Sequence, residues 1–325
     1  MGGLRRLPCR GGTAMLPLAA MRVQAAPRDG MGAGPGGPPA STRGGVLAGV
    51  LLMLGAGACF AALDASGKWL NQAANPVGTA AVRYVASFLL VSLFINPWTP
   101  AGLPRSARPG LQVVRAGFLV AATLCSFTAY RSLPLTQATA ITFAAPLIVA
   151  VLAGPLLGEW VGRRGAAAVL AGFGGVLVIT RPFGAGFQPA MLLALGTAFA
   201  NAGYIVATRF LAGRDTSRTT LFYTGLVGTV AAVPALPFTW APPGSLLGWA
   251  VTGALGVFGA AGHWLMILAH RRAPASLLAP FSYGQLLWAA ALGGWVFGEA
   301  PDRWTLLGGG VVIAAGLYLL WAGRR

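Results

Sequence analysis

Ten apolar stretches follow one another between residues 46 and 322 of this chain. Each is close to the roughly 20 residues that a helix needs to cross the hydrocarbon core of a bilayer. They lie at 46–69, 77–95, 112–131, 135–157, 164–180, 189–210, 219–238, 246–269, 275–297 and 304–322. Turn-forming sequences separate them, such as Asn71–Pro76 and Ala241–Gly244, and the short Ser132–Pro134 link predicts a tight antiparallel hairpin. The pattern predicts an all-α transmembrane protein with ten helices.

Charge supports the same fold class. Charged residues make up only 9% of the chain, against about a quarter in soluble proteins, so lipid is the solvent that fits. The net charge of +17 comes from arginines scattered singly or in pairs between apolar stretches, and no nucleic-acid motif occurs, so we expect no nucleic-acid partner. Cys9, Cys59 and Cys125 form no CxxC pair, which predicts neither a disulfide nor a metal site.

The first 44 residues differ from the rest. They are rich in Gly, Pro, Ala and Arg without apolar periodicity, which predicts a disordered basic tail over residues 1–44. Three other interpretations stay open. The segment is compatible with a signal peptide whose apolar part is broken by Pro17, with a true start at Met15, Met21 or Met31, and with a loose contact to anionic lipid.

The distribution of Lys and Arg predicts the orientation. With the N-terminus in the cytoplasm, 18 arginines fall on the cytoplasmic side and three, Arg131, Arg181 and Arg303, on the outer side. Cytoplasmic loops carry the excess of basic residues in membrane proteins, so both termini are predicted to be cytoplasmic, which requires an even number of spans. We expect a multi-pass protein of the bacterial inner membrane, with the lipid bilayer as a partner.

The sequence also matches itself after a shift of 140 residues. Tyr130–Pro134 then lies over His270–Pro274, and Leu157–Glu159 lies over Phe297–Glu299. The predicted units are therefore residues 45–182 and 183–325, with five spans each. Because five is odd, the second half enters the membrane upside down. Inverted repeats of this kind are typical of secondary transporters, which bind the solute near the mid-plane.

With these repeat ends, the opening Phe60–Trp69 and the stretch Ala279–Tyr283, residues 46–322 resemble the drug/metabolite transporter superfamily, and within it the EamA-type ten-helix transporters. The family includes exporters of amino acids and toxic compounds and importers of vitamins and other metabolites. The resemblance implies transport of a small organic solute and places spans four and nine beside the cavity.

Ionisable residues inside spans are candidates for function because they are expensive to bury in lipid. Asp64 and Lys68 lie four residues apart on one face of the first span, which predicts either an ion pair that solute or proton can disturb or a self-neutralising structural pair. Lys68 is close enough to the span end to snorkel outward, and Asp64 is the better candidate for protonation. Arg83 either attracts an anionic group or pairs with Asp64 to fix helix packing.

Further polar and aromatic side chains are candidates for lining a cavity. His263, beside Trp264 in the eighth span, is either a proton-coupling group or a satisfied core histidine. Asn201 and Tyr204 share a face of the sixth span, and Tyr204 is the repeat partner of Asp64. The ninth span contributes Tyr283, Gln285 and Trp288, and the fourth span contributes Gln137 in the corresponding region.

Glu159 and Glu299 fall at span ends on opposite sides of the membrane, so they cannot act together as catalytic carboxylates. We expect them to be structural residues at the repeat ends, which cap the following turn or pair with Arg163 and Arg303. No nucleophile elbow or phosphate loop occurs, and no cofactor is expected.

The favoured function is secondary transport of a small organic metabolite, such as an amino acid, a vitamin or a drug-like solute, by alternating access and with possible proton or ion coupling. A lipid-linked sugar flippase, supported by Arg83 and Arg115, and an intramembrane enzyme built on Asp64 and Lys68 are the alternatives. The sequence leaves the solute, the direction of transport, the coupling ion and the oligomeric state open.

Overall fold

The computed structural model describes residues 43–94, 104–158, 160, 162–182, 186–211, 214–272, 278 and 281–322. In this part of the chain every regular element is helical. The elements are α1 (Arg43–Leu70), α2 (Pro76–Phe94), α3 (Pro109–Ala129), α4 (Leu135–Thr142), α5 (Ala145–Leu157), α6 (Arg163–Thr180), α7 (Ala190–Leu211), α8 (Ser217–Ala232), η2 (Val233–Ala235), α9 (Leu236–Thr239), α10 (Leu246–Arg272), α12 (Gly284–Phe297) and α13 (Arg303–Ala322). The predicted tail, residues 1–44, lies almost wholly outside the described residues.

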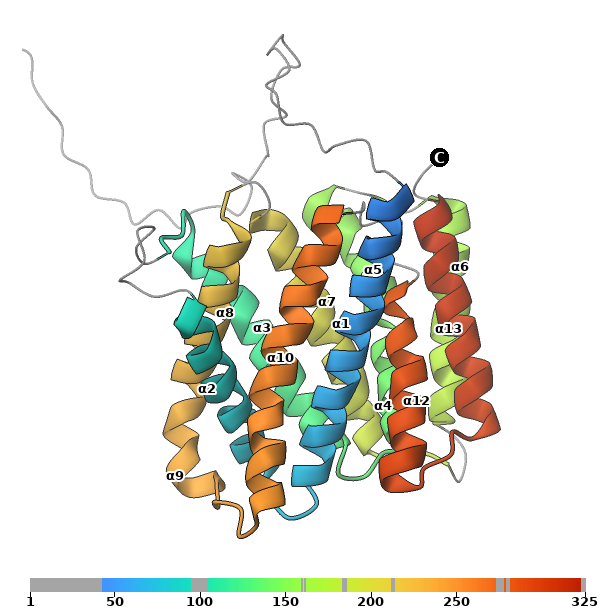
Figure 1. The fold of residues 1–325 in the computed structure, drawn as a ribbon. Helices are drawn as coiled ribbons and strands as arrows, with labels where there is room; N and C mark the ends of the chain where they lie inside the picture. Colours follow the sequence, from blue (N-terminus) through green and yellow to red (C-terminus); the bar gives the residue numbers. More distant parts are fainter. Residues whose placement is uncertain are drawn as a thin grey trace, which may run out of the picture. The chain divides into compact units, whose positions relative to one another are not determined.

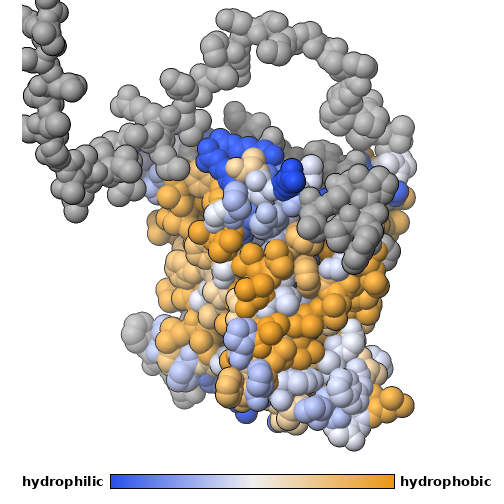
Figure 2. Space-filling view, turned by 90° about the vertical axis from the view of Figure 1, so that its left-hand side faces the viewer, coloured by the Kyte–Doolittle hydropathy of each residue, from blue (hydrophilic) through white to orange (hydrophobic). Residues whose placement is uncertain are grey.

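Eight helical segments are long and apolar enough to cross a membrane, and α12 and α13 contribute two shorter apolar segments. Most helices run side by side along one common direction, and α1 begins at the same end of the bundle at which α13 ends (Figure 1). One face carries an apolar band around its middle with hydrophilic residues toward both ends (Figure 2). Large apolar side chains such as Leu170 and Trp295 are 73% and 86% exposed, as expected of surfaces that meet lipid. The chain is therefore an all-α, multi-pass membrane protein.

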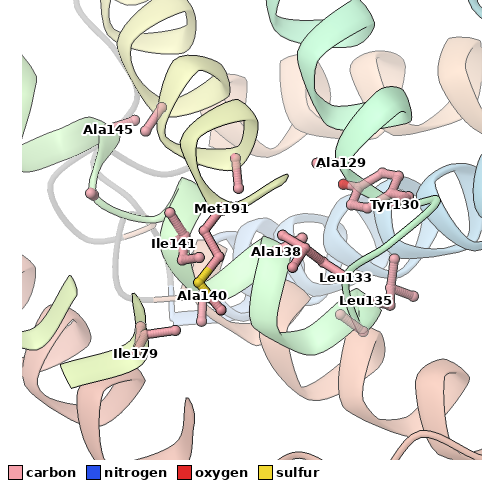
Figure 3. Packing of buried hydrophobic residues seen from close by; sticks show 14 of the residues in the cluster. Ala129, Tyr130, Leu133, Leu135, Ala138, Ala140, Ile141, Ala145, Ile179 and Met191 are labelled. Atoms are coloured by element: carbon pink, nitrogen blue, oxygen red, sulfur yellow. The ribbon is translucent and has the colours of Figure 1, made fainter. Parts of the chain in front are cut away.

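The core lies where α4 packs between α7, α12 and α13. Ile141 of α4 and Met191 of α7 are almost fully buried, and Figure 3 shows their side chains beside each other, with Ala140 next to them. Leu133 and Leu135, on either side of Pro134, are also buried there. The short link that the sequence predicted thus turns the chain directly from α3 into the most buried helix of the bundle.

The fourth predicted span is one crossing made of two helices. α4 ends at Thr142 and α5 begins at Ala145, because the ring of Pro146 cannot donate a hydrogen bond and would clash with the carbonyl of Thr142. The ninth span is interrupted at Tyr283, which lies 140 residues after Phe143. The two aromatic rings contact each other at 5.0 Å between centroids. Both interruptions therefore meet in the interior.

Glycines bring α6 and α13 into backbone contact. A Cβ atom added to Gly175 would lie 2.8 Å from the carbonyl oxygen of Gly308. Close approach of this kind is how small residues pack membrane helices without a hydrophobic driving force between them. Gly174, the preceding residue, has nothing within 4 Å of the same added atom.

We expect Gly175→Ala to destabilise the protein by about 1–3 kcal/mol, since the new methyl group meets backbone rather than a side chain that can move. Gly174→Ala is the matched control and should leave stability unchanged or raise it, because Ala favours helix. Thermal unfolding of both purified variants, followed by tryptophan fluorescence, measures the difference. Equal melting temperatures would show that the two helices do not approach this closely.

Asp302 begins the last helix. Its Oδ1 accepts a hydrogen bond of 2.8 Å from the Thr305 N–H, and its Oδ2 accepts one of 3.0 Å from Arg181. Burial alone would raise the pKa of Asp302, but the hydrogen bonds from Thr305 and the charges of Arg181 and Arg303 outweigh it and lower the pKa. A carboxylate in this position stabilises the start of a helix.

Because the folded-state pKa of Asp302 is lowered, its charge contributes stability above the unfolded pKa of about 3.9, and the contribution is lost as pH falls through the folded pKa. We therefore expect Asp302→Asn to melt slightly below the wild type at pH 7 and pH 5. The gap should begin to narrow below about pH 4 and should close only when the pH is below the lowered pKa of the folded state. Melting curves of both proteins across this range test it, and a gap that does not narrow between pH 5 and pH 3 would contradict it.

Candidate functional site

A cavity of about 380 Å³ lies in the interior, with walls from α1, α2, α3, α4, α5, α7, α10 and α12. We call it the central cavity. Six of the residues that the sequence singled out line it, namely Asp64, Arg83, Asn201, Tyr204, His263 and Gln285. Asp64 and Tyr204, which lie 140 positions apart in the sequence, are both on its wall. The structure thus brings together side chains that lie up to 221 positions apart in the sequence.

The carboxylate of Asp64 has neutral partners. Its Oδ2 accepts a hydrogen bond of 3.2 Å from Gln285, and Tyr130 is a second hydrogen-bonding partner. The ion pair with Lys68 that the spacing suggested is not formed, and Asp64 forms none with Arg83 either. The expectation failed because spacing places Asp64 and Lys68 on one face of α1, whereas a carboxylate on another helix competes for the lysine.

Arg83 is also held by neutral groups. It is only 8% exposed, its Nη1 donates to Thr123 Oγ1 at 2.6 Å, and its guanidinium lies 4.9 Å from the centre of the Tyr84 ring. Its Nε is buried without a hydrogen-bond partner. The central cavity is therefore lined by one carboxylate and one guanidinium that do not neutralise each other in a direct pair.

Lys68 binds Glu299 instead. Its ammonium group donates to Glu299 Oε1 and, at 2.7 Å, to the carbonyl oxygen of Leu133, while Glu299 Oε2 accepts from the Leu135 N–H at 3.0 Å. Gly298, at φ +67°, ends α12 and directs the chain so that Glu299 reaches this position. We call these four residues the Lys68–Glu299 cluster, and it ties the end of α1 to the start of α4 and the end of α12. Glu299 thus caps the start of α4 and pairs with Lys68, instead of capping the turn that follows it or pairing with Arg303 as the sequence suggested.

A second cavity of about 350 Å³ adjoins the central one. Tyr204, His263 and Met266 line both, so they form the wall between the two. The second cavity is also lined by Arg115 and by Asp215, which lies in the loop between α7 and α8. Arg115 was counted among the cytoplasmic arginines and was considered as a site residue only for the flippase alternative. Its position inside the predicted span 112–131 was the signal that could have placed it in the interior.

Gln112 links Arg115 to Asp215. The Gln112 side chain accepts from Arg115 Nε at 3.2 Å and donates to Asp215 Oδ2 at 2.7 Å. Asp215 also accepts hydrogen bonds from Ser106 and from the Ala107 N–H. Burial opposes ionisation of Asp215, but these hydrogen bonds outweigh it and lower the pKa. Asp215 is thus an ionised group at the edge of the second cavity.

Four other candidates lie outside both cavities. Trp264 and Trp288 are 54% and 45% exposed. Trp264 points outward because consecutive helix positions differ by about 100° and the preceding residue, His263, takes the inward-facing one. Gln137 and Tyr283 are buried in the packed interior, and Tyr283 contacts Phe143. Glu159 lies outside the described residues. Their expected place on the cavity wall is therefore corrected for Trp264, Trp288, Gln137 and Tyr283.

The EamA-like transporter family matches the chain in two segments, residues 47–181 and 188–322, which together make up more than half of its length. This chain belongs to the EamA-like transporter family. The resemblance to drug/metabolite transporters is thereby confirmed. The two matched segments meet at the central cavity, since Asp64 and Arg83 come from the first and Tyr204, His263 and Gln285 from the second.

Curated relatives of this EamA-like transporter carry different solutes in their names. It is 27% identical to an S-adenosylmethionine uptake transporter of Rickettsia bellii, over 81% of this chain and 89% of the relative. It is 27% identical to a riboflavin transporter of Vibrio cholerae, over 84% and 93%. It is 26% identical to a pseudopaline exporter of Pseudomonas aeruginosa, over 83% and 95%. The family and these names identify a small-metabolite transporter and not an enzyme.

A protein of known crystal structure shares the fold of this EamA-like transporter. The TM-score is 0.59 at 20% sequence identity, and the similarity covers 87% of this chain and 99% of the other. At this level of identity the likeness concerns the arrangement of helices alone.

Proposed function

We propose that this chain is a secondary transporter of the bacterial inner membrane that carries a small organic solute through the central cavity by alternating access. In this proposal ten spans form two inverted halves, residues 45–182 and 183–325, and both termini are cytoplasmic. The solute is an amino acid, a vitamin or a drug-like compound. The observation that carries the proposal is a cavity with polar and charged walls, built from both segments of the family match.

Helix packing supports the inverted repeat. In the proposed repeat, α1, α2 and α3 have α7, α8 and α10 as their counterparts, the α4–α5 pair has α12, and α6 has α13. When every helix is replaced by its counterpart, the α1–α10 contact becomes α7–α3 and the α2–α10 contact becomes α8–α3. The α1–α12 contact becomes one between α7 and the α4–α5 pair. All of these contacts are present. The α2–α8 and α6–α13 contacts map onto themselves, as a pseudo-two-fold axis between the halves requires.

The ends of the bundle support a direction. With cytoplasmic termini, the Lys68–Glu299 cluster closes the outer end and the second cavity lies toward the cytoplasm. The repeat counterpart of Lys68 is Thr208, a neutral residue that lines the second cavity. Thr208 cannot form an ion pair at the cytoplasmic end as Lys68 does at the outer end. This difference supports a conformation that is closed to the outside.

Counterflow in proteoliposomes tests the proposal with a panel of S-adenosylmethionine, riboflavin and aromatic amino acids. We expect saturable exchange of at least one of them. Ser126→Trp, whose new ring fills the central cavity, should abolish the exchange, while Thr128→Trp on the exposed face of the same helix should not. Protein-dependent exchange that survives Ser126→Trp would exclude the central cavity as the path.

A further inference from the structure

Arg115 is the most deeply buried cation of the described residues. It has no exposed surface, although arginines inside a membrane protein are costly and normally pair with a carboxylate. Neither ion pair among the described residues includes it. Its Nε and Nη2 bind the neutral oxygens of Gln112, Thr220 and Thr224. Its Nη1 has no hydrogen-bond partner. A full positive charge with a free donor therefore lies beside the second cavity.

Asp215 does not supply the missing negative charge. Its carboxylate accepts hydrogen bonds from Ser106, the Ala107 N–H and Gln112, and it reaches Arg115 only through the Gln112 amide. The amide bridge holds the guanidinium in place and leaves Nη1 for another acceptor. Since a buried charge is stabilised by a partner of opposite sign, an anionic group of the passing solute is the natural complement.

The same design occurs in the central cavity. Arg83 and Arg115 each lie over a tyrosine ring, at 4.9 Å and 4.8 Å, each bind a threonine hydroxyl, and each keep one nitrogen without a partner. The ring beneath Arg115 belongs to Tyr204, which forms part of the wall between the cavities. Two arginines with unsatisfied donors thus lie on successive cavities along one path.

We propose that Arg115 forms a carboxylate-binding subsite in the second cavity, and that the transported solutes carry a carboxylate which passes between Arg115 and Arg83. This inference rests on the proposed transport function. A carboxylate fits better than a phosphate dianion, because one guanidinium faces the second cavity and Asp215 on the same wall repels a second negative charge. Asp64 in the central cavity favours solutes that also carry a cationic group, such as zwitterions.

Because Arg115 is fully covered in this conformation, a carboxylate reaches it only when the covering side chains move. Tyr204 is one of them, since the guanidinium lies over its ring. Binding at the subsite is therefore coupled to the wall that separates the two cavities. A neutral solute lacks this interaction and gains nothing from Arg115.

Matched solutes that differ only in the carboxylate test the inference. S-adenosylmethionine is compared with its decarboxylated form, and L-tryptophan with L-tryptophanamide, by thermal shift of the purified full chain and by counterflow. We expect the wild type to bind the acid of at least one pair at least about tenfold more tightly than its partner, the discrimination of one charged hydrogen-bonded group. Arg115→Gln should remove this preference, and Arg115→Lys should retain part of it.

Val114→Ala controls for general damage near the subsite, because Val114 adjoins Arg115 in α3, is 53% exposed and lines neither cavity. It should keep the preference for the acid. Equal binding of acid and neutral forms by the wild type would overturn the inference, as would an equal loss of both forms in Arg115→Gln. Transport of riboflavin alone would overturn the carboxylate subsite and leave the proposed transport function standing. If no solute is exchanged, the proposed function fails, and thermal shifts alone decide the subsite.

Discussion

Glu299→Gln is expected to lower counterflow by at least about tenfold, which corresponds to about 1.4 kcal/mol, and to open the central cavity to the outer side. The substitution removes the negative charge that pairs with Lys68 and leaves the ammonium group in place. Lys68 as a whole residue is only 6% exposed. Removing one partner of a buried ion pair destabilises a protein by about 3–5 kcal/mol, and because Glu299 is partly exposed we expect a smaller loss here. The Leu135 N–H also loses its charged acceptor.

Accessibility of the cavity separates loss of closure from loss of fold. A cysteine at Ser126, on the wall of the central cavity, is introduced after Cys9, Cys59 and Cys125 are replaced. A membrane-impermeant maleimide added from outside should label it faster in Glu299→Gln than in the parent. Unchanged labelling together with unchanged counterflow would mean that the Lys68–Glu299 cluster does not close the outer end.

Asp302→Asn is the matched control for this experiment. Arg181 and Asp302 form the other ion pair of the described residues, and their side chains are 32% and 41% exposed. Exposed pairs contribute little, so neither labelling nor counterflow should change. A difference between the two variants then reflects the position of Glu299 between three helices and not the loss of a negative charge as such.

The positions of the helices were predictable because their apolar lengths are set by the bilayer. Nine of the predicted spans agree with described helices to within a few residues, and only 281–297 and residue 278 of the ninth are described. The break in the fourth span was not predicted, although Pro146 indicates it, because a proline within an apolar stretch is compatible with a continuous, kinked helix as well as with two helices.

Partners across the bundle were much harder to predict than helices. Helical spacing tells which residues of one helix share a face, and on that basis Lys68 was assigned to Asp64. Its actual partner, Glu299, lies 231 positions away, and nothing within either helix indicates the other. Arg115 was counted with the cytoplasmic charges because it lies near the start of a span, where the orientation rule counts it. Burial inside the bundle depends on neighbouring helices that the local sequence does not specify.

Asp64→Asn is expected to abolish solute accumulation driven by a pH gradient, while counterflow without a gradient continues. Asp64 is the acidic residue among the described residues that line the central cavity, and its partners Gln285 and Tyr130 are neutral. A carboxylate held by neutral groups can gain or lose a proton without breaking an ion pair. Asn keeps the size and the hydrogen-bonding capacity of the side chain and removes the proton site.

Every other charged or titratable group that faces Asp64 has to be tested beside it. These are Arg83 from α2, Tyr130 at the end of α3, Tyr204 from α7 and His263 from α10, while Lys68 on the same helix is held by Glu299. His263→Gln should keep the response to a pH gradient if Asp64 is the coupling residue, and Asp64→Glu should restore it in part. Uptake of the counterflow solute is measured with and without an imposed gradient. Gradient-driven accumulation at the wild-type level in Asp64→Asn would exclude Asp64 from coupling, and its loss in His263→Gln alone would assign coupling to the histidine in the wall between the two cavities.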